Sequence, residues 1–317
     1  MYSYTTLIKV AELYYKKKYS QKEISKELSV SVPTVSRMLQ ESIDLGIVQV
    51  KIVNIESQAH SLGEKIKEKY DIEEIIILET PSNGNDWDLK KLLGKKSSEF
   101  ISDLFNAGEK VGIGPGSTMS ELIESLSTDL NIPAIQILPI MGSWGIHNLT
   151  TETNKLVSSM ARVLRTDYYL LPAPAIVSSE NVKNMFLNEP QISAVTELWE
   201  KLDTVIFSIG PEIENSLFPT LTDNRDIIEN VKSLKAVGDI AGRIINEDGE
   251  ELDIDYNRRL ISIPIDVLKK IPKRVGIGGG QNKYRSVKAA LEAGIVNYLI
   301  TDYQTCLYIL ENGGNEK

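Results

Sequence analysis

The first 55 residues alternate helix-like segments with polar breaks. Apolar side chains recur three and four positions apart over residues 4–18, as they do along the buried face of a helix, at Leu7, Ile8, Ala11, Tyr14 and Tyr15. A second helix is predicted over residues 21–28, because Ser20 stands at its N-cap position and Glu23 completes a capping box. Ser31 is placed to cap a third helix, and Pro33 fits its first turn, where a missing N–H is tolerated.

The third helix has an inward apolar side and an outward polar side. Val35, Met38 and Leu39 point inward, whereas Val32, Thr34, Ser36 and Arg37 lie partly outward. Two short helices separated by about three residues, the second polar at its start, are the geometry that lays a recognition helix in a major groove. Lys22, Lys26 and Arg37 would then reach phosphates or base edges. The alternative interpretation is a three-helix cap that only packs.

Gly46 ends the third helix, and the pattern then changes. Residues 47–53 are predicted to form a short strand or wing, and residues 56–69 a connecting helix with Leu62 and Ile66 at helical spacing. Strands are predicted over 74–78, 110–113, 134–139, 166–171, 204–209, 259–263, 274–277 and 296–300. Helices are predicted over 89–105, 118–126, 153–164, 265–271, 284–293 and 304–310. This alternation predicts an α/β domain with a parallel sheet covered on both faces.

Charge separates the same two parts of the chain. The 317 residues hold 35 Lys and Arg against 44 Asp and Glu, a net charge of -9 that argues against a wholly basic nucleic-acid-binding surface. Residues 1–55, however, hold seven Lys and one Arg against five acids, and so carry a net charge of +3. This asymmetry suggests that only the N-terminal part meets a polyanion.

Cysteine content and hydropathy place the protein in a reducing compartment. A single cysteine, Cys306, allows no internal disulfide framework and is expected in the core. No signal peptide and no apolar run long enough to span a membrane are present, so a cytoplasmic protein with no membrane partner is expected. The only histidines are His60 and His147, which with one cysteine assemble no common metal site, and no Ser/His/Asp set points to acyl transfer. His147 is read as incidental; neither a metal nor a cofactor is predicted.

Two glycine-rich loops, each between a strand and a helix, are the main candidates for binding a ligand. The first, Gly114-Pro115-Gly116-Ser117-Thr118, combines bared amides, a helix N-terminus and two hydroxyls, which suits a phosphate; a tight turn that binds nothing is the other interpretation. No Lys follows its last glycine, so it is not a nucleotide P-loop. The second loop, residues 275–283, places Gly279 among three adjacent glycines and Lys283 beside them. Two such loops in one sheet favour a phosphorylated ligand.

Further polar positions follow other strands. Gly210 closes one strand, Met141 and Gly142 follow another, and Glu152 and Asn154 downstream are suited to sugar hydroxyls. Asp239 brings a carboxylate into a glycine-containing loop, with a solvated loop Asp as the alternative, and Asn257 and Arg259 complete the polar set.

Taken in order, the motifs resemble the SorC family of sugar-responsive bacterial transcriptional regulators over nearly the whole chain. They are the segment QKEISKELSVSVPTVSRMLQESIDLGIV, GIGPGSTM from Gly112, YYLLPAPAIVSS from Tyr168, NEPQI from Asn188, VGDIAGR from Val237, NRRLISI from Asn257 and GIGGGQNKYRSVKAALEAGIVNYLITD from Gly276. Two helix-turn-helix positions depart from the family pattern: Ser25 replaces the usual alanine, and Ser29 the usual turn glycine. A left-handed serine at the turn would cost about 1 kcal/mol.

The resemblance implies a division of labour along the chain. Residues 1–55 would be a helix-turn-helix domain, 56–72 a linker helix, and 73–317 a Rossmann-like effector and oligomerisation domain similar to ribose-5-phosphate isomerase and glucosamine-6-phosphate deaminase, but without turnover. Operator DNA would be read by Gln21, Lys22, Ser31, Val32, Pro33, Thr34, Ser36 and Arg37. A phosphorylated sugar or polyol would be bound by Gly114, Pro115, Gly116, Ser117, Thr118, Met141, Gly142, Glu152, Asn154, Gly210, Asp239, Gly279 and Lys283.

The implied function is allosteric regulation of a carbohydrate or polyol catabolic operon by a tetramer that is not an enzyme. Within the effector set, Pro115 to Thr118 would hold the phosphate and Asp239 the hydroxyls. Met141 stands where some relatives place Arg or Lys, so neither a second phosphate site nor covalent capture is expected. The rival function is a sugar-phosphate isomerase or deaminase with an accessory N-terminal module.

Overall fold

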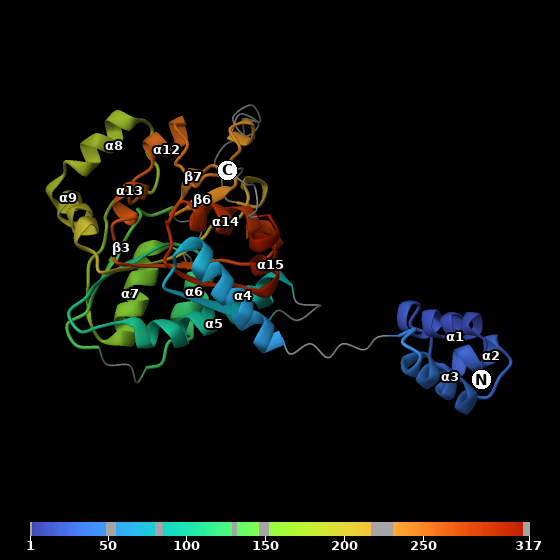
Figure 1. Cartoon of the computed structure of the whole chain (residues 1–317). Coiled ribbons are helices and arrows are strands. Elements are labelled where there is room, and N and C mark those ends of the chain that lie inside the picture. The colour runs from blue at the N-terminus through green and yellow to red at the C-terminus, as the bar shows by residue number, and fades with distance from the viewer. Residues whose placement is uncertain are drawn as a thin grey trace. The chain divides into compact units, whose positions relative to one another are not determined.

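The computed structural model describes residues 2–48, 55–79, 85–128, 132–145, 152–216 and 231–312. By its internal contacts the chain divides into two compact units, Met1–Asn54 and Ile55–Lys317, each of which is described by itself (Figure 1).

The N-terminal unit is a small helical cluster. Its elements are α1 (Tyr4–Ala11), the π-helical turn η1 (Glu12–Lys16), α2 (Gln21–Glu27) and α3 (Val32–Asp44). They bury one apolar core, made of Leu7, Val10, Leu13, Ile24, Val35, Met38 and Leu39. The Ser20–Glu23 capping box and the Ser31 cap are confirmed, because both serine side chains accept a backbone N–H of the following helix.

The turn between α2 and α3 requires a left-handed residue. Ser29 adopts φ 53°, the conformation that a glycine would take without strain. The predicted wing over residues 47–53 falls largely outside the described residues.

The second unit is an α/β domain built on a parallel sheet. Its strands are β1 (Glu74–Leu78), β2 (Lys110–Ile113), β3 (Gln136–Pro139), β4 (Asp167–Tyr168), β5 (Thr204–Ser208), β6 (Gly238–Ile240), β7 (Arg243–Ile245), β8 (Lys273–Ile277) and β9 (Tyr298–Asp302). Its α-helices are α4 (Ile55–Tyr70), α5 (Asp86–Leu104), α6 (Ser117–Glu124), α7 (Thr153–Leu164), α8 (Glu180–Leu187), α9 (Pro190–Thr196), α12 (Asp255–Arg259), α13 (Ile265–Leu268), α14 (Tyr284–Glu292) and α15 (Tyr303–Glu311). Short 3-10 turns lie at η3 (Glu197–Lys201), η4 (Ile213–Asn215) and η5 (Gln281–Lys283).

Seven strands form the sheet in the order β1-β9-β8-β5-β2-β3-β4, and every neighbouring pair is parallel. The prediction of a parallel α/β sheet is therefore confirmed. One predicted strand, residues 259–263, is wrong: Arg259 ends helix α12, and Leu260 and Ser262 make only isolated bridges. Helices α8 and α9 and the antiparallel hairpin β6–β7 were not predicted from the sequence.

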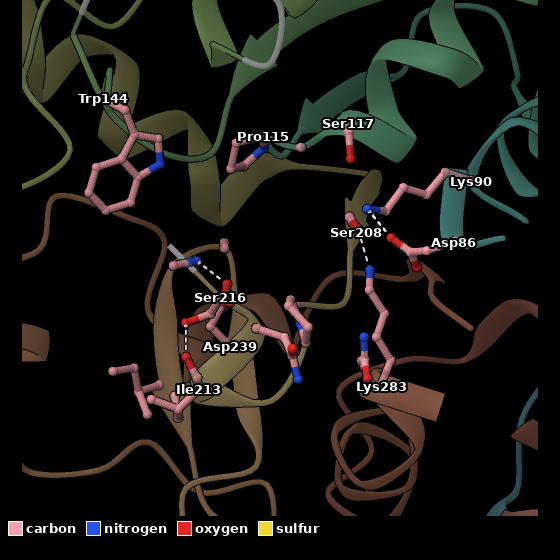
Figure 2. Close-up of a pocket in the computed structure, with 18 of the residues that line it drawn as sticks. Asp86, Lys90, Pro115, Ser117, Trp144, Ser208, Ile213, Ser216, Asp239 and Lys283 are labelled. Carbon is pink, nitrogen blue, oxygen red and sulfur yellow. Dashed lines mark hydrogen bonds and ion pairs between the residues drawn. The ribbon is translucent and has the colours of Figure 1, made fainter. Parts of the chain in front are cut away.

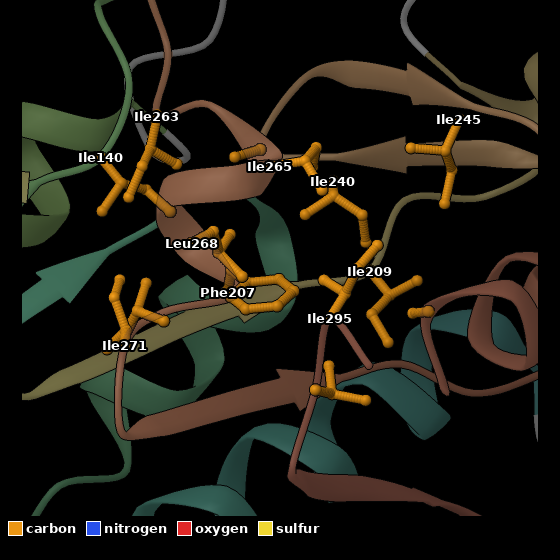
Figure 3. Packing of buried hydrophobic residues seen from close by; sticks show 14 of the residues in the cluster. Ile140, Phe207, Ile209, Ile240, Ile245, Ile263, Ile265, Leu268, Ile271 and Ile295 are labelled. Carbon is orange, nitrogen blue, oxygen red and sulfur yellow. The ribbon is translucent and has the colours of Figure 1, made fainter. Parts of the chain in front are cut away.

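The two faces of the sheet bury separate apolar cores, because successive side chains of a strand point to opposite faces. On β5, Ile206 packs with the core under helices α5, α6 and α7. Val205 and Phe207 pack on the other side, with residues of α13, α14 and α15 (Figure 3). Cys306 is buried in this second core, as expected. Because both faces of the sheet are covered, a ligand is expected to bind at the loops that follow the carboxyl ends of the strands.

Candidate functional site

A cavity of about 320 Å³ opens where three adjacent strands, β2, β5 and β8, end (Figure 2). This is the position at which open α/β sheets bind ligands, and the volume suits a small phosphorylated sugar. The cavity is lined by Asp86, Lys90, Pro115, Gly116, Ser117, Trp144, Ser208, Gly210, Pro211, Ile213, Asn215, Ser216, Asp239, Ala241, Gly242, Ile244, Tyr256, Asn282 and Lys283.

The first glycine loop presents a helix N-terminus to this cavity. Helix α6 begins at Ser117. Its N-cap residue is Gly116, with φ 128°, so no N-cap side chain accepts a hydrogen bond from the first amides of the helix. Pro115, Gly116 and Ser117 line the cavity. Gly114 and Thr118 are buried behind them; a side chain on Gly114 would meet Phe207 Cβ at 2.9 Å. The uncapped amides and the positive end of the helix dipole form an anion-binding surface.

Lys283 faces the cavity from the opposite loop. The side chain is buried, and its ammonium Nζ donates to the hydroxyl of Ser208 at 3.2 Å. Burial, with the nearby charge of Lys90 adding to it, lowers the pKa of Lys283 to about 8. Lys283 is thus a cation held out of water, which favours an anionic ligand over solvent as its partner.

The second glycine loop is organised by an internal carboxylate. Asp302 Oδ2 accepts from the Gly280 amide at 2.6 Å, and a side chain on Gly279 would lie 2.4 Å from that same oxygen. Gly279 itself does not line the cavity. Gly279 therefore makes room for Asp302, and the loop contributes Lys283 and Asn282 to the cavity.

Asp239 stands across the cavity on strand β6. Its Oδ2 accepts from the Gly242 amide at 3.0 Å within the β6–β7 hairpin, and burial raises its pKa. Gly210 is required next to it, because a Cβ there would lie 1.9 Å from Asp239 Oδ1. Tyr256 also lines the cavity. Burial, and to a lesser extent the charge of Asp239, raises the pKa of Tyr256, so its phenol stays neutral.

Seven residues predicted for the effector site do not line the cavity: besides Gly114, Thr118 and Gly279, described above, these are the four residues Met141, Gly142, Glu152 and Asn154. Met141 is fully buried, with its methyl group against Gly242, and Gly142 packs against the backbone of Pro174. Glu152 caps α7 by accepting from the amides of Asn154 and Lys155. The Asn154 side chain is engaged on both sides by the backbone of Leu171, at 2.9 and 3.0 Å. The roles of these four residues in the structure are packing and capping.

Several lining residues were missed by the sequence analysis. Lys90 and Asp86 come from the first turns of α5, where an acid and a base four residues apart are typical of an exposed helix. Trp144, Ser208 and Asn215 carry no motif either. Only the fold brings these side chains to the glycine loops.

The residues predicted to meet DNA lie on α2 and α3. Exposed side chains among them are those of Lys22, Ser31, Val32, Pro33, Ser36 and Arg37, while Gln21 and Thr34 are half-buried. The Ser31 hydroxyl is engaged in capping, since Thr34 N donates to it at 3.3 Å. Arg37 makes no ion pair with another described residue, so its guanidinium is available to a partner.

Within the described ranges, no three His, Cys, Asp or Glu side chains are arranged to hold a metal ion. His60 is exposed on α4, and His147 lies outside the described residues. No helix among the described residues is long and apolar enough to cross a membrane.

Comparison with known proteins gives consistent results over the whole chain. Residues 56–311 match the family described as "Putative sugar-binding domain". The deoxyribonucleoside regulator of Bacillus subtilis is 25% identical over 300 residues, which cover 94% of this chain and 95% of that protein. The sorbitol operon regulator of Klebsiella pneumoniae is 23% identical over 307 residues, 96% of this chain and 97% of that one.

Solved structures share the fold. The full-length sorbitol operon regulator of Klebsiella pneumoniae superposes with a TM-score of 0.74 at 22% identity, covering 98% of this chain and 99% of that chain. A transcriptional regulator from Streptococcus pneumoniae gives a TM-score of 0.76 at 22% identity over 83% of this chain and 100% of that one. These relatives carry the names of regulators rather than of enzymes.

Proposed function

Because the chain belongs to the SorC family of sugar-binding transcriptional regulators, we propose that its N-terminal unit binds operator DNA under the control of a phosphorylated sugar or polyol held in the second unit. One observation carries the proposal: the uncapped N-terminus of α6 and the buried ammonium of Lys283 line a single cavity. A helix N-terminus and a desolvated cation are what a phosphate requires.

The rest of the cavity suits the hydroxyls of the same ligand. Asp239 faces the cavity with one carboxylate oxygen engaged by Gly242, and Asn215 and Asn282 add amide groups. Trp144 supplies an aromatic surface for the apolar side of a sugar or polyol chain. In this assignment Gly116, Ser117, Ser208 and Lys283 hold the phosphate, and Asp239 reads a hydroxyl.

The ligand would be held without a covalent bond. A Schiff base needs an amine, and Met141, the position at which some relatives place Lys, has none and is buried. Lys283 is protonated at neutral pH and hydrogen-bonded to Ser208, which suits it to an ion pair with phosphate.

DNA would be bound by the exposed side chains of α2 and α3. Lys22 and Arg37 would contact phosphates or base edges, and Ser36 and Val32 would face the major groove. The net charge of +3 on residues 1–55 is small, and assembly into a tetramer would multiply it across a palindromic operator. The ligand would shift this oligomer between binding and non-binding arrangements, which requires that it favour one of them. We place this activity in the cytoplasm.

The rival function is an isomerase or deaminase acting on a sugar phosphate, because the family resemblance implies an effector domain similar to those enzymes. The full chain should not turn over ribose 5-phosphate or glucosamine 6-phosphate. Turnover of either substrate that Lys283→Met abolishes would favour the rival.

The deciding experiment is a gel shift with the full chain. DNA from upstream of the operon that neighbours its gene should bind with an affinity that falls steeply with salt, and a panel of sugar and polyol phosphates should include one that changes this affinity. Absence of salt-sensitive DNA binding would overturn the proposal.

A further inference from the structure

Two lysines and two aspartates face the cavity, and the arrangement of one pair is unlike that of the other. Lys283 is buried, Asp239 is half-buried, and the two come from opposite sides. Lys90 and Asp86 both lie at the start of α5, where Lys90 Nζ and Asp86 Oδ2 form an ion pair at 2.6 Å. The Lys90 side chain is 27% exposed and the Asp86 side chain 57%, so this second pair stands at the rim of the cavity.

The two ammonium groups point toward the same part of the cavity. Figure 2 shows Lys90 and Lys283 approaching Ser208 from opposite sides, with Ser117 nearby. They are close enough for the charge of Lys90 to lower the pKa of Lys283, while Asp86 acts in the opposite sense. An anion bound between them would relieve this repulsion, and a phosphate dianion carries two charges for two cations.

Asp86 occupies the position of a competitor for that anion. It already holds Lys90, and its carboxylate would repel a phosphate that approached the N-terminus of α6. Both residues sit in the first two turns of α5, just after the N-cap Asn85. An ion pair between residues four apart on an exposed helix surface stabilises only weakly, so a charged ligand can break it.

We propose that Lys90 is a further phosphate ligand, and that phosphate binding transfers Lys90 from Asp86 to the ligand. This inference rests on the proposed function, since it concerns the same cavity and a phosphorylated ligand. It makes the first turn of α5 the segment that registers whether the cavity is occupied. It also sets the ligand class: a phosphate dianion gains both lysines, whereas an unphosphorylated sugar gains neither.

The test is a double-mutant cycle with inorganic phosphate as the probe, in which binding is measured by isothermal titration calorimetry at low ionic strength. Lys90→Gln should weaken phosphate binding roughly tenfold. Asp86→Asn should tighten it about threefold or more, because Lys90 no longer has to leave a partner. In the Lys90→Gln background, Asp86→Asn should tighten binding by a clearly smaller factor than it does in the wild type, because only the direct repulsion between the carboxylate and phosphate is then removed.

Matched controls are Lys95→Gln and Asp103→Asn, which alter exposed charges farther along α5 and should leave binding unchanged. A gain of affinity in Asp86→Asn cannot come from misfolding, so the cycle does not depend on the behaviour of a weakened variant. Equal effects of Asp86→Asn in both backgrounds, or binding by Lys90→Gln within about twofold of wild type, would overturn the inference.

The outcomes separate this inference from the proposed function. If wild type binds phosphate and Lys283→Met abolishes binding while Lys90→Gln does not, the phosphate site stands and the role of Lys90 is refuted. If wild type binds neither inorganic phosphate nor any sugar phosphate, both are refuted.

Discussion

The carboxylate of Asp302 lies inside the second glycine loop, where its Oδ2 accepts from the Gly280 amide at 2.6 Å. Its other oxygen, Oδ1, accepts from the amides of Gln304 and Thr305 and so caps α15. One side chain therefore joins the start of α15 to the turn that carries Lys283, whose own amide donates to the Gly280 carbonyl at 2.9 Å.

Asp302→Asn tests this link with almost no change of shape. The Asn amide would place a donor against the Gly280 N–H, which leaves a buried donor without a partner, so we expect a loss of about 1–3 kcal/mol in unfolding free energy. Phosphate affinity should fall with it, because the Lys283 turn loosens. Urea denaturation and phosphate titration measure the two effects. Asp266→Asn, an exposed aspartate on α13, is the control and should change neither; wild-type values for Asp302→Asn would contradict the assignment.

The buried ammonium of Lys283 should destabilise the ligand-free protein. Burial lowers its folded pKa to about 8, whereas an unfolded lysine titrates near 10.4, so the folded state binds fewer protons between these values. Stability should therefore rise as pH increases from 8 to 10. At pH 7, Lys283→Met should raise the unfolding free energy by about 1–3 kcal/mol and should remove that rise. Denaturation at pH 7 and 9.5 measures both; Lys288→Met, at a half-buried lysine of α14 that pairs with Glu292, should keep the wild-type pH dependence between 8 and 10.

Phosphate affinity should depend on the same titration. A bound dianion raises the pKa of Lys283, so the affinity should be highest between about pH 7 and 8, where inorganic phosphate is largely a dianion and the lysine is charged. Above pH 8 it should fall by up to about tenfold per pH unit. Isothermal titration with inorganic phosphate across pH 6–9.5 measures the profile. A flat profile from pH 7.5 to 9.5 would rule out a contact between Lys283 and phosphate.

Arg37 should be needed for DNA and not for folding. Its side chain is exposed on α3, so Arg37→Ala should leave the melting temperature unchanged. DNA affinity should drop by about 1–3 kcal/mol, with a shallower salt dependence if the contact is to phosphate and a relaxed sequence preference if it is to a base. Gel shifts across a salt series distinguish these. Lys9→Ala, an exposed cation on α1, is the matched control and should bind as wild type does.

Ser29→Gly should stabilise the N-terminal unit. The left-handed conformation of Ser29 costs about 1 kcal/mol, and glycine would avoid this cost. The greater conformational freedom of glycine in the unfolded state offsets part of the gain, so a net stabilisation of about 0.5 kcal/mol is expected. Slower hydrogen exchange of the α3 amides would report it. Ser36→Gly, at an exposed position of helix α3, should instead speed the exchange of these amides, because glycine destabilises the interior of a helix.

The sequence predicted the features that depend on neighbours along the chain. Both caps in the N-terminal unit and most strands of the parallel sheet belong to this class, since a Ser–Glu capping box or a β-branched run needs no distant partner. The hairpin β6–β7 was missed because Ala241 and Gly242, both with positive φ, read as a loop. Strand 259–263 was predicted on its apolar run alone, and among the described residues it makes only isolated bridges, of Leu260 with Ile176 and of Ser262 with Met141.

The candidate site was predicted where the chain itself joins a strand to a helix. Pro115, Gly116, Ser117, Gly210, Asp239 and Lys283 share the cavity. Lys90 reaches it from the start of a helical pattern, and two of the three glycines near Lys283, Gly279 and Gly280, contact Asp302, which lies 22 residues from Gly280. Neither relationship leaves a local signal, because each arises only when distant strands become neighbours in the sheet.

The pairing of β1 with β9 sets the order in which each copy of the protein becomes complete. Ile76 on the first strand lies beside Ile300 on the last, and the cavity draws side chains from Asp86 to Lys283. The N-terminal unit has its own core and needs none of this, and domains fold as units while the ribosome still extends the chain. A copy in synthesis thus carries a finished N-terminal unit long before its cavity exists. Any ligand can act only on chains whose synthesis has passed β9.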